Sequence, residues 1–106
     1  KCTKLEELSL DNNLIQSLEG FEHFEHLRKL SLNNNEIYFN EEQQFNFDFC
    51  FNRLTYLSIC NNKLSSLKFL AHSNSLIEFY ASRNNLKNLR ESFHLKCLLC
   101  LLILDL

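Results

Sequence analysis

Proline is absent from the 106 residues of this chain, and glycine occurs once, at Gly20. A chain with so little of both offers no flexible linker between domains, and its length fits one domain or part of one. A single glycine also excludes a glycine-rich phosphate-binding loop and the G-x-S-x-G motif of a nucleophilic serine. We therefore expect neither an enzyme nor a cofactor site.

Neither sign of charge dominates the chain, which has 11 basic and 13 acidic residues and a net charge of −2. Because nucleic-acid-binding proteins concentrate basic residues on one surface, we expect no nucleic-acid partner. The most apolar stretch, residues 95–106, contains Lys96 and Asp105 and is too short to cross a bilayer. We therefore expect no membrane partner.

The five cysteines are odd in number and irregularly spaced, unlike a disulfide framework. No N-x-S/T glycosylation sequon occurs among the 14 asparagines, and no signal peptide opens the chain. These features favour a reducing compartment, so we expect a cytoplasmic protein.

Metal-ligating residues do not fall at the spacings of known metal motifs. Cys97 and Cys100 form a C-x-x-C pair, but no second pair of ligands follows in register. Leucines surround both thiols, which favours buried structural cysteines over a metal or redox site. His23 and His26 have the order H-x-E-H, which matches no zinc-protease motif. We expect no metal site and place both histidines on the convex surface, in solvent.

A nine-residue pattern recurs along the chain. It first appears over residues 5–13 as L-x-x-L-x-L-x-x-N, returns from Leu27, Leu54 and Leu76, and begins a fifth time at Leu101. Four full copies at this spacing resemble leucine-rich repeats and predict one repeat segment over residues 1–106. Because neither end has a polar cap, we expect a fragment of a longer solenoid.

Alternation within each copy predicts the fold class. Leu8 and Leu10 are two residues apart, so on an extended strand they share one face, and stacking neighbouring copies buries that face. We expect an α/β fold: a right-handed solenoid with a parallel β-sheet on its concave face and helices or 3₁₀ turns on its convex face. The predicted strands lie near residues 7–11, 29–33, 56–60, 78–82 and 103–106.

An asparagine follows the last strand leucine of each full copy by three residues. Its side-chain amide can satisfy backbone groups where the chain bends away from the sheet. We expect a buried structural ladder, whereas the preceding Asn61 should face solvent. The ladder residues are Asn13, Asn35, Asn62 and Asn84.

The segments between the predicted strands differ from one repeat to the next, so the structure predicted for the convex side differs between repeats. In the first repeat apolar residues recur every third position, which suits a helix or 3₁₀ turn, and Gly20 stands where a positive φ is needed. In the second repeat, Phe45–Phe51 alternates like a strand, although a helix from Glu41 also fits; its aromatic residues belong either to the core or to an exposed patch. The fourth repeat predicts a helix over residues 86–98.

The repeat lengths support a closer resemblance. The first and third repeats span 22 residues, the second 27 and the fourth 25. The 22-residue form resembles the repeat class of the protein phosphatase 1 regulatory subunit and the axonemal dynein light chain. Residues 76–84, 95–98 and 102–106 also look like the leucine-rich repeat-containing protein 9 family. These resemblances imply an intracellular protein-binding scaffold or regulatory module, in the cytoplasm, a cilium or the cytoskeleton.

The concave face carries the candidate binding residues. Tyr56 and Tyr80 should be exposed diagonal neighbours, and tyrosine is frequent in binding hot spots. An equally good interpretation is that they merely cover the sheet, and the segment can also be a non-catalytic part of a larger enzyme or regulatory protein. The predicted protein-binding residues are Glu7, Lys29, Tyr56, Glu78, Tyr80 and Arg83.

Overall fold

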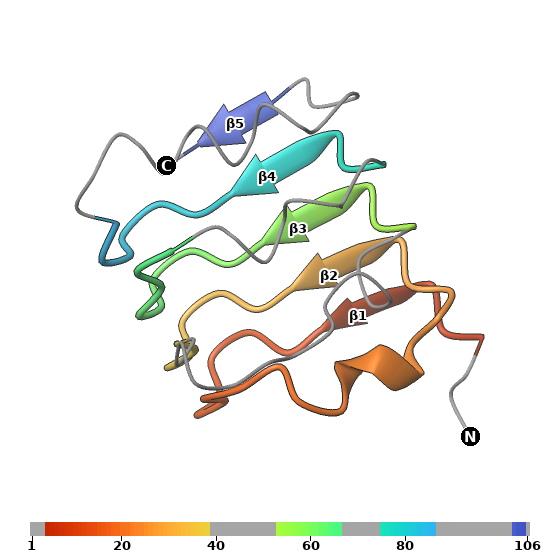
Figure 1. Ribbon diagram of the computed structural model, residues 1–106, viewed down its shortest axis with the longest axis horizontal. Coiled ribbons are helices and arrows are strands. Elements are labelled where there is room, and N and C mark those ends of the chain that lie inside the picture. The colour runs from red at the N-terminus through yellow and green to blue at the C-terminus, as the bar shows by residue number, and fades with distance from the viewer. Residues whose placement is uncertain (1–3, 39–52, 67–74, 87–102, 106) are drawn as a thin grey trace.

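The computed structural model describes residues 4–38, 53–66, 75–86 and 103–105 (Figure 1). The segment Phe45–Phe51, the helix predicted from Glu41 and almost all of the helix predicted over residues 86–98 lie outside these ranges. The same holds for the C-x-x-C pair formed by Cys97 and Cys100.

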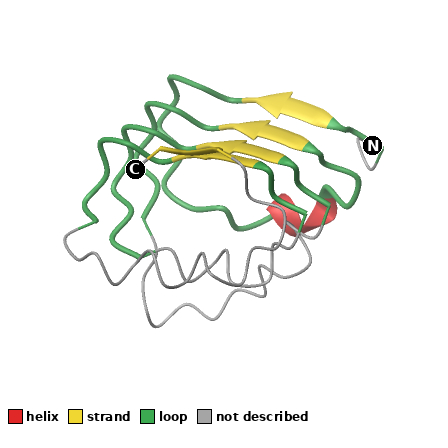
Figure 2. Ribbon diagram, turned by 90° about the horizontal axis from the view of Figure 1, so that it is seen from above, coloured by secondary structure: helices red, strands yellow, loops and turns green. Residues whose placement is uncertain are grey.

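Five parallel strands form one sheet, in the order β1-β2-β3-β4-β5, as the repeat pattern predicts (Figures 1 and 2). Equivalent positions of successive repeats pair with one another, so the sheet register follows the sequence pattern without a slip. The strands are β1 (Glu7–Ser9), β2 (Lys29–Ser31), β3 (Tyr56–Ser58), β4 (Glu78–Tyr80) and β5 (Ile103–Asp105).

The apolar positions of the pattern form one continuous core behind the sheet. Leu30, Leu57 and Phe79 occupy the same position in β2, β3 and β4, and none of the three has exposed area. Their equivalent Leu8, on the edge strand β1, is only half-buried. Each strand thus depends on neighbours on both sides to bury its apolar face. The buried apolar residues are Leu18, Leu27, Leu30, Leu32, Ile37, Leu54, Leu57, Ile59, Leu64, Leu76, Phe79 and Ala81.

The first four strands are three residues long, shorter than predicted at their carboxyl ends. After each of the first four strands, the chain turns through a residue with positive φ, a conformation that no strand contains. Backbone pairing nevertheless continues beyond the strand, since Leu10 N–H donates to Ser31 O and Asn12 N–H donates to Asn33 O, both at 2.9 Å. The prediction that the first strand extends to residue 11 was therefore wrong, although the backbones of neighbouring repeats remain hydrogen-bonded there.

The first convex segment contains the predicted 3₁₀ turn, η1 (Phe21–His23), away from the strand layer in Figure 2. Gly20 precedes it with φ of 95°, so the expected positive φ is present. The rings of Phe21 and Phe24 meet edge to face with centroids 5.7 Å apart. Both rings pack against the core and so attach this turn to it.

The asparagine at the end of the second, third and fourth patterns bonds to its own repeat and to the preceding one. The Asn62 amide nitrogen donates to Leu32 O at 2.9 Å and to Ile59 O at 3.2 Å, while its oxygen accepts from Ile37 N–H at 3.0 Å. Asn35 and Asn84 repeat this arrangement one repeat before and one repeat after. Asn13 bonds to carbonyls of its own repeat and is exposed. Asn35, Asn62 and Asn84, which we call the inner asparagines, therefore bond each turn to the repeat before it.

A second asparagine series lies one residue earlier, on the surface, and the sequence reasoning did not predict it. Asn12, Asn34 and Asn61 have φ values of 61°, 59° and 56°. Their amides bond in a row: Asn34 donates to Asn12 at 2.9 Å, and Asn61 donates to Asn34 at 2.7 Å. Asparagine tolerates the left-handed conformation better than other residues with a Cβ. Arg83 holds the same position in the fourth repeat, with φ of 58°.

We predict that Asn62→Ala destabilises the fold more than either Asn61→Ala or Asn61→Gly. The first change leaves buried carbonyls and an amide without partners, at about 1–3 kcal/mol for each buried group left unpaired. Asn61 is exposed, but alanine in its left-handed conformation costs about 1–2 kcal/mol. Glycine avoids that cost, so Asn61→Gly isolates the loss of the surface amide. Urea midpoints measure all three variants, and equal midpoints for Asn62→Ala and Asn61→Gly contradict the structural role of Asn62.

We also predict that Arg83→Asn stabilises the chain by about 1 kcal/mol, because asparagine relieves the left-handed strain and can continue the surface series. Thermal unfolding should show a rise in Tm of about 4–8 °C. Lys63→Asn is the matched control, since it removes the same charge at an exposed position without positive φ. A comparable gain in both variants would attribute the effect to charge instead of backbone conformation.

Candidate functional site

The concave face consists of the strand side chains that point away from the core. Pairing places them in two rows across the sheet; the first row changes from charged to aromatic between β2 and β3, and the second changes from serine to tyrosine between β3 and β4. Charged or small residues lie on β1 and β2, whereas β3 and β4 each contribute a tyrosine. The first row contains Glu7, Lys29, Tyr56 and Glu78, and the second contains Ser9, Ser31, Ser58 and Tyr80.

Tyr56 and Tyr80 are in direct ring contact. The register pairs Tyr56 with Glu78 and Ser58 with Tyr80. These four residues form a square on the sheet, which we call the tyrosine square, and the two tyrosines occupy one of its diagonals. Their ring centroids are 5.6 Å apart and the ring planes are tilted by 49°. Both side chains are half-buried, so the expectation of full exposure was wrong. The reason is that each ring shields one side of the other.

The other diagonal of the square contains Ser58 and Glu78. Ser58 is 5% exposed, whereas Ser31 is half-buried and Ser9 exposed in the same row. This trend follows the neighbours, because Ser58 pairs directly with Tyr80, whereas Ser9 and Ser31 pair with serines in the first three strands. The Tyr80 hydroxyl donates to Glu78 Oε1 at 3.4 Å, which places the carboxylate at the edge of the aromatic pair.

A polar track borders the tyrosine square where the strands end. Asp11 Oδ1 accepts from Ser31 Oγ and from Asn33 N–H, both at 2.7 Å. Asn33 Oδ1 accepts from Ser58 Oγ and from Cys60 N–H, both at 2.8 Å. Each repeat therefore orders the serine of the next one. The track holds Ser58 in place beneath the tyrosines.

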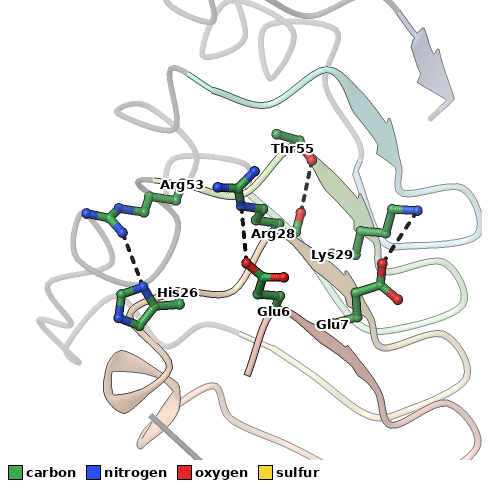
Figure 3. A network of polar contacts seen from close by, with 7 residues as sticks. All are labelled: Glu6, Glu7, His26, Arg28, Lys29, Arg53 and Thr55. Atoms are coloured by element: carbon green, nitrogen blue, oxygen red, sulfur yellow. Dashed lines mark hydrogen bonds and ion pairs between the residues drawn. The ribbon is translucent and has the colours of Figure 1, made fainter. Parts of the chain in front are cut away.

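The opposite border carries ion pairs (Figure 3). Lys29 Nζ lies 3.8 Å from Glu7 Oε1, and Arg28 Nε lies 3.9 Å from Glu6 Oε1. All four side chains are more than half exposed, so these pairs add little to stability. Their main effect is to neutralise charge. Each pair joins a glutamate of the first repeat to a basic residue of the second, so neither positive nor negative charge is in excess at this border.

His26 belongs to the same polar network and is not simply solvated as expected. Its Nδ1 lies 3.2 Å from an Arg53 guanidinium nitrogen, and the ring is half-buried (Figure 3). Nearby, the Thr55 hydroxyl donates to Arg28 O at 3.1 Å. His23, in contrast, is exposed on η1, as expected. The two histidines therefore have different surroundings despite being three residues apart.

A shallow hollow of about 360 Å³ adjoins the tyrosines on the side of β1 and β2. It exists because the second row has serines there, while Tyr80 fills the equivalent space on β4. The ring of Tyr56 forms one wall. The lining residues are Glu7, Leu8, Ser9, Lys29, Leu30, Ser31 and Tyr56.

Five of the six predicted binding residues share this face, since Glu7, Lys29, Tyr56, Glu78 and Tyr80 all lie in the two strand rows. Arg83 does not: it lies beyond β4, exposed in the turn. The alternation of inward and outward side chains predicts orientation only within a strand, and β4 ends at Tyr80. The residues missed by sequence reasoning are Asp11 and Asn33, whose role depends on contacts between repeats.

The described ranges contain no cluster of three or more histidine, cysteine, aspartate or glutamate side chains able to hold a metal ion. Within those ranges no helix is long and apolar enough to span a membrane. Cys60 is a free, half-buried thiol whose sulfur accepts a hydrogen bond from Ser82 Oγ at 3.3 Å.

Comparison with known proteins supports the same architecture. Residues 3–43 match the family described as Leucine Rich repeats (2 copies), whereas no curated protein matches the sequence significantly. An internalin from Listeria monocytogenes superposes with a TM-score of 0.73, at 23% identity, over 92% of this chain and 27% of its own. Internalin C2 from the same organism gives a TM-score of 0.39, at 17% identity, over 94% of this chain and 74% of its own.

The first internalin likeness concerns the fold alone, and this chain spans about a quarter of that protein's length. Leucine-rich repeat domains are generally protein–protein interaction modules and typically non-catalytic, because stacked repeats create an extended binding surface. The repeated pattern, the parallel sheet with one strand per repeat, and the family match over the first repeats lead to one conclusion. The chain has the fold of a leucine-rich repeat solenoid.

Proposed function

We propose that this solenoid binds a protein partner through its concave face and serves as a scaffold or regulatory surface. The contact between Tyr56 and Tyr80 is the observation that carries the proposal. Two aromatic rings on an open sheet supply a large apolar area with little rotamer entropy to lose on binding. Hot spots in protein interfaces have this composition, with an aromatic centre and a polar rim.

The residues around the tyrosines fit the role of that rim. Lys29 and Glu7 lie on the same face, Glu78 is hydrogen-bonded to Tyr80, and Arg83 projects from the turn after β4. Rim charges mainly affect association rate and partner selection, and less the total affinity. The hollow beside Tyr56 gives a partner side chain a place to lie between Ser31 and the ring.

The buried framework holds the fold beneath these face residues. The core leucines and the inner asparagines hold the backbone, while Tyr56 and Tyr80 are half-buried and lie outside the buried core cluster. The network of Asp11, Asn33 and Ser58 also fixes the sheet beneath the tyrosines before any partner arrives. A preorganised surface of this kind loses less entropy on association than a mobile one.

We also propose that the repeats belong to the 22-residue intracellular class, similar to the protein phosphatase 1 regulatory subunit and leucine-rich repeat-containing protein 9, and that the protein is cytoplasmic, including a cilium or the cytoskeleton. Two repeats of 22 residues, an odd number of cysteines and the lack of sequons support this. Localisation of the tagged protein in its own cells tests the compartment. A secreted or surface-exposed protein would contradict the proposal.

We predict that Tyr56→Ala and Tyr80→Ala each weaken partner binding by about 1–2 kcal/mol, or about 5–30-fold in Kd. The fold should change little, because both side chains lie outside the core cluster. His23→Ala on η1 is the control, since its side chain is exposed and belongs to another part of the molecule. Quantitative affinity capture with the three variants identifies the partner, and calorimetric titration then measures its Kd.

Circular dichroism and thermal unfolding establish that each variant retains its fold. If His23→Ala reduces binding more than either tyrosine change, the binding surface lies on the convex side and the proposal is wrong. If none of the three changes affects the captured partner, the tyrosine pair serves only to cover the sheet.

A further inference from the structure

The charges of the concave face are unevenly compensated among the described residues. On β1 and β2, the Glu7 carboxylate and the Lys29 ammonium group lie 3.8 Å apart and neutralise one another. On β4, Glu78 accepts a hydrogen bond from the Tyr80 hydroxyl, and no lysine or arginine of the described residues forms an ion pair with it. Glu78 is half-buried, whereas Glu7 is exposed, so water screens the charge of Glu78 less.

Tyr56 brings an aromatic face next to that carboxylate. The two residues are direct partners across β3 and β4, so their side chains stand side by side on the same face. Cβ atoms of such partners lie about 5 Å apart. Tyr80 tilts against Tyr56 at 49°, which fixes the position of the ring. An aromatic face and a carboxylate at this separation can both contact one cationic group.

We propose that the tyrosine square is a site for a lysine or arginine side chain of the protein partner. The cationic head would lie over the ring of Tyr56 and pair with the Glu78 carboxylate, while its alkyl stem lies along the hollow. This inference deepens the proposed function and depends on it. Both interactions act on the same charge, since aromatic faces attract cations and a half-buried carboxylate attracts them further.

The alternatives fit the square less well. An acidic partner side chain would meet the Glu78 carboxylate, and like charges in close contact disfavour binding. A purely apolar side chain could use the ring of Tyr56 but would cover the Glu78 carboxylate without giving it a partner. A cationic side chain satisfies the ring and the carboxylate together. Charge complementarity therefore selects the cationic occupant.

The test uses the full 106-residue chain and a random twelve-residue peptide library displayed on phage. Peptides selected on the wild-type chain should carry lysine or arginine at one aligned position. In synthetic copies, replacing that lysine by norleucine, or that arginine by citrulline, should raise Kd about 3–30-fold. The same replacement should raise Kd by a smaller factor in Glu78→Gln and in Tyr56→Leu, since each variant removes one of the two contacts of the cation.

Glu6→Gln is the matched control, because it removes the same charge from a carboxylate that pairs with Arg28 outside the two strand rows. It should leave the peptide charge dependence unchanged. Glu78→Gln changes one atom of a half-buried surface residue and keeps the test valid if Tyr56→Leu fails to fold. Circular dichroism establishes the folded state of each variant.

The outcomes separate this inference from the proposed function. Peptides that bind less well to Tyr56→Ala and Tyr80→Ala but show no dependence on a cation overturn the inference alone. Peptides that bind these alanine variants as tightly as the wild type overturn the proposed function too. A library that yields no binding peptide counts against both.

Discussion

The inner asparagine side chains are the interaction on which the rest of this solenoid depends. Each strand has only three residues, and the chain then turns sharply through a left-handed residue. At that turn backbone carbonyls would be buried without partners, at a cost comparable to the stability of a small domain. Asn35 and Asn62 supply the missing donors and acceptors, and each does so for two successive repeats.

Sequence spacing predicted the features that depend on alternation and on buried apolar area. Leu8, Leu30 and Leu57 are equivalent in the pattern, and they are aligned in the sheet. The outward-facing residues follow from the same alternation, which correctly predicts that Tyr56 and Glu78 lie on one surface. These predictions succeed because a one-residue slip would turn every leucine out of the core.

Features that depend on contact between repeats were harder to predict. The half-burial of Tyr56 and Tyr80 arises from their mutual contact, which no single repeat contains. The left-handed conformation of Arg83 was missed for a similar reason: its sequence gives no sign of it, and only alignment with Asn12, Asn34 and Asn61 reveals the shared turn. The asparagines at that position were available as a signal, because asparagine is enriched in left-handed turns.

The break in the surface asparagine series weakens the junction between the third and fourth repeats. Between the third and fourth repeats Arg83 replaces asparagine, and the polar track passes through the Cys60 thiol, a weaker acceptor than an amide or carboxylate oxygen. In a linear array, stability is close to a sum of nearest-neighbour terms, so this junction should open more readily than the two described junctions before it. Tyr56 and Tyr80 stand on opposite sides of this junction. A partner that binds both rings would therefore hold the third and fourth repeats together, and occupancy of the site would slow the local unfolding of the fourth repeat.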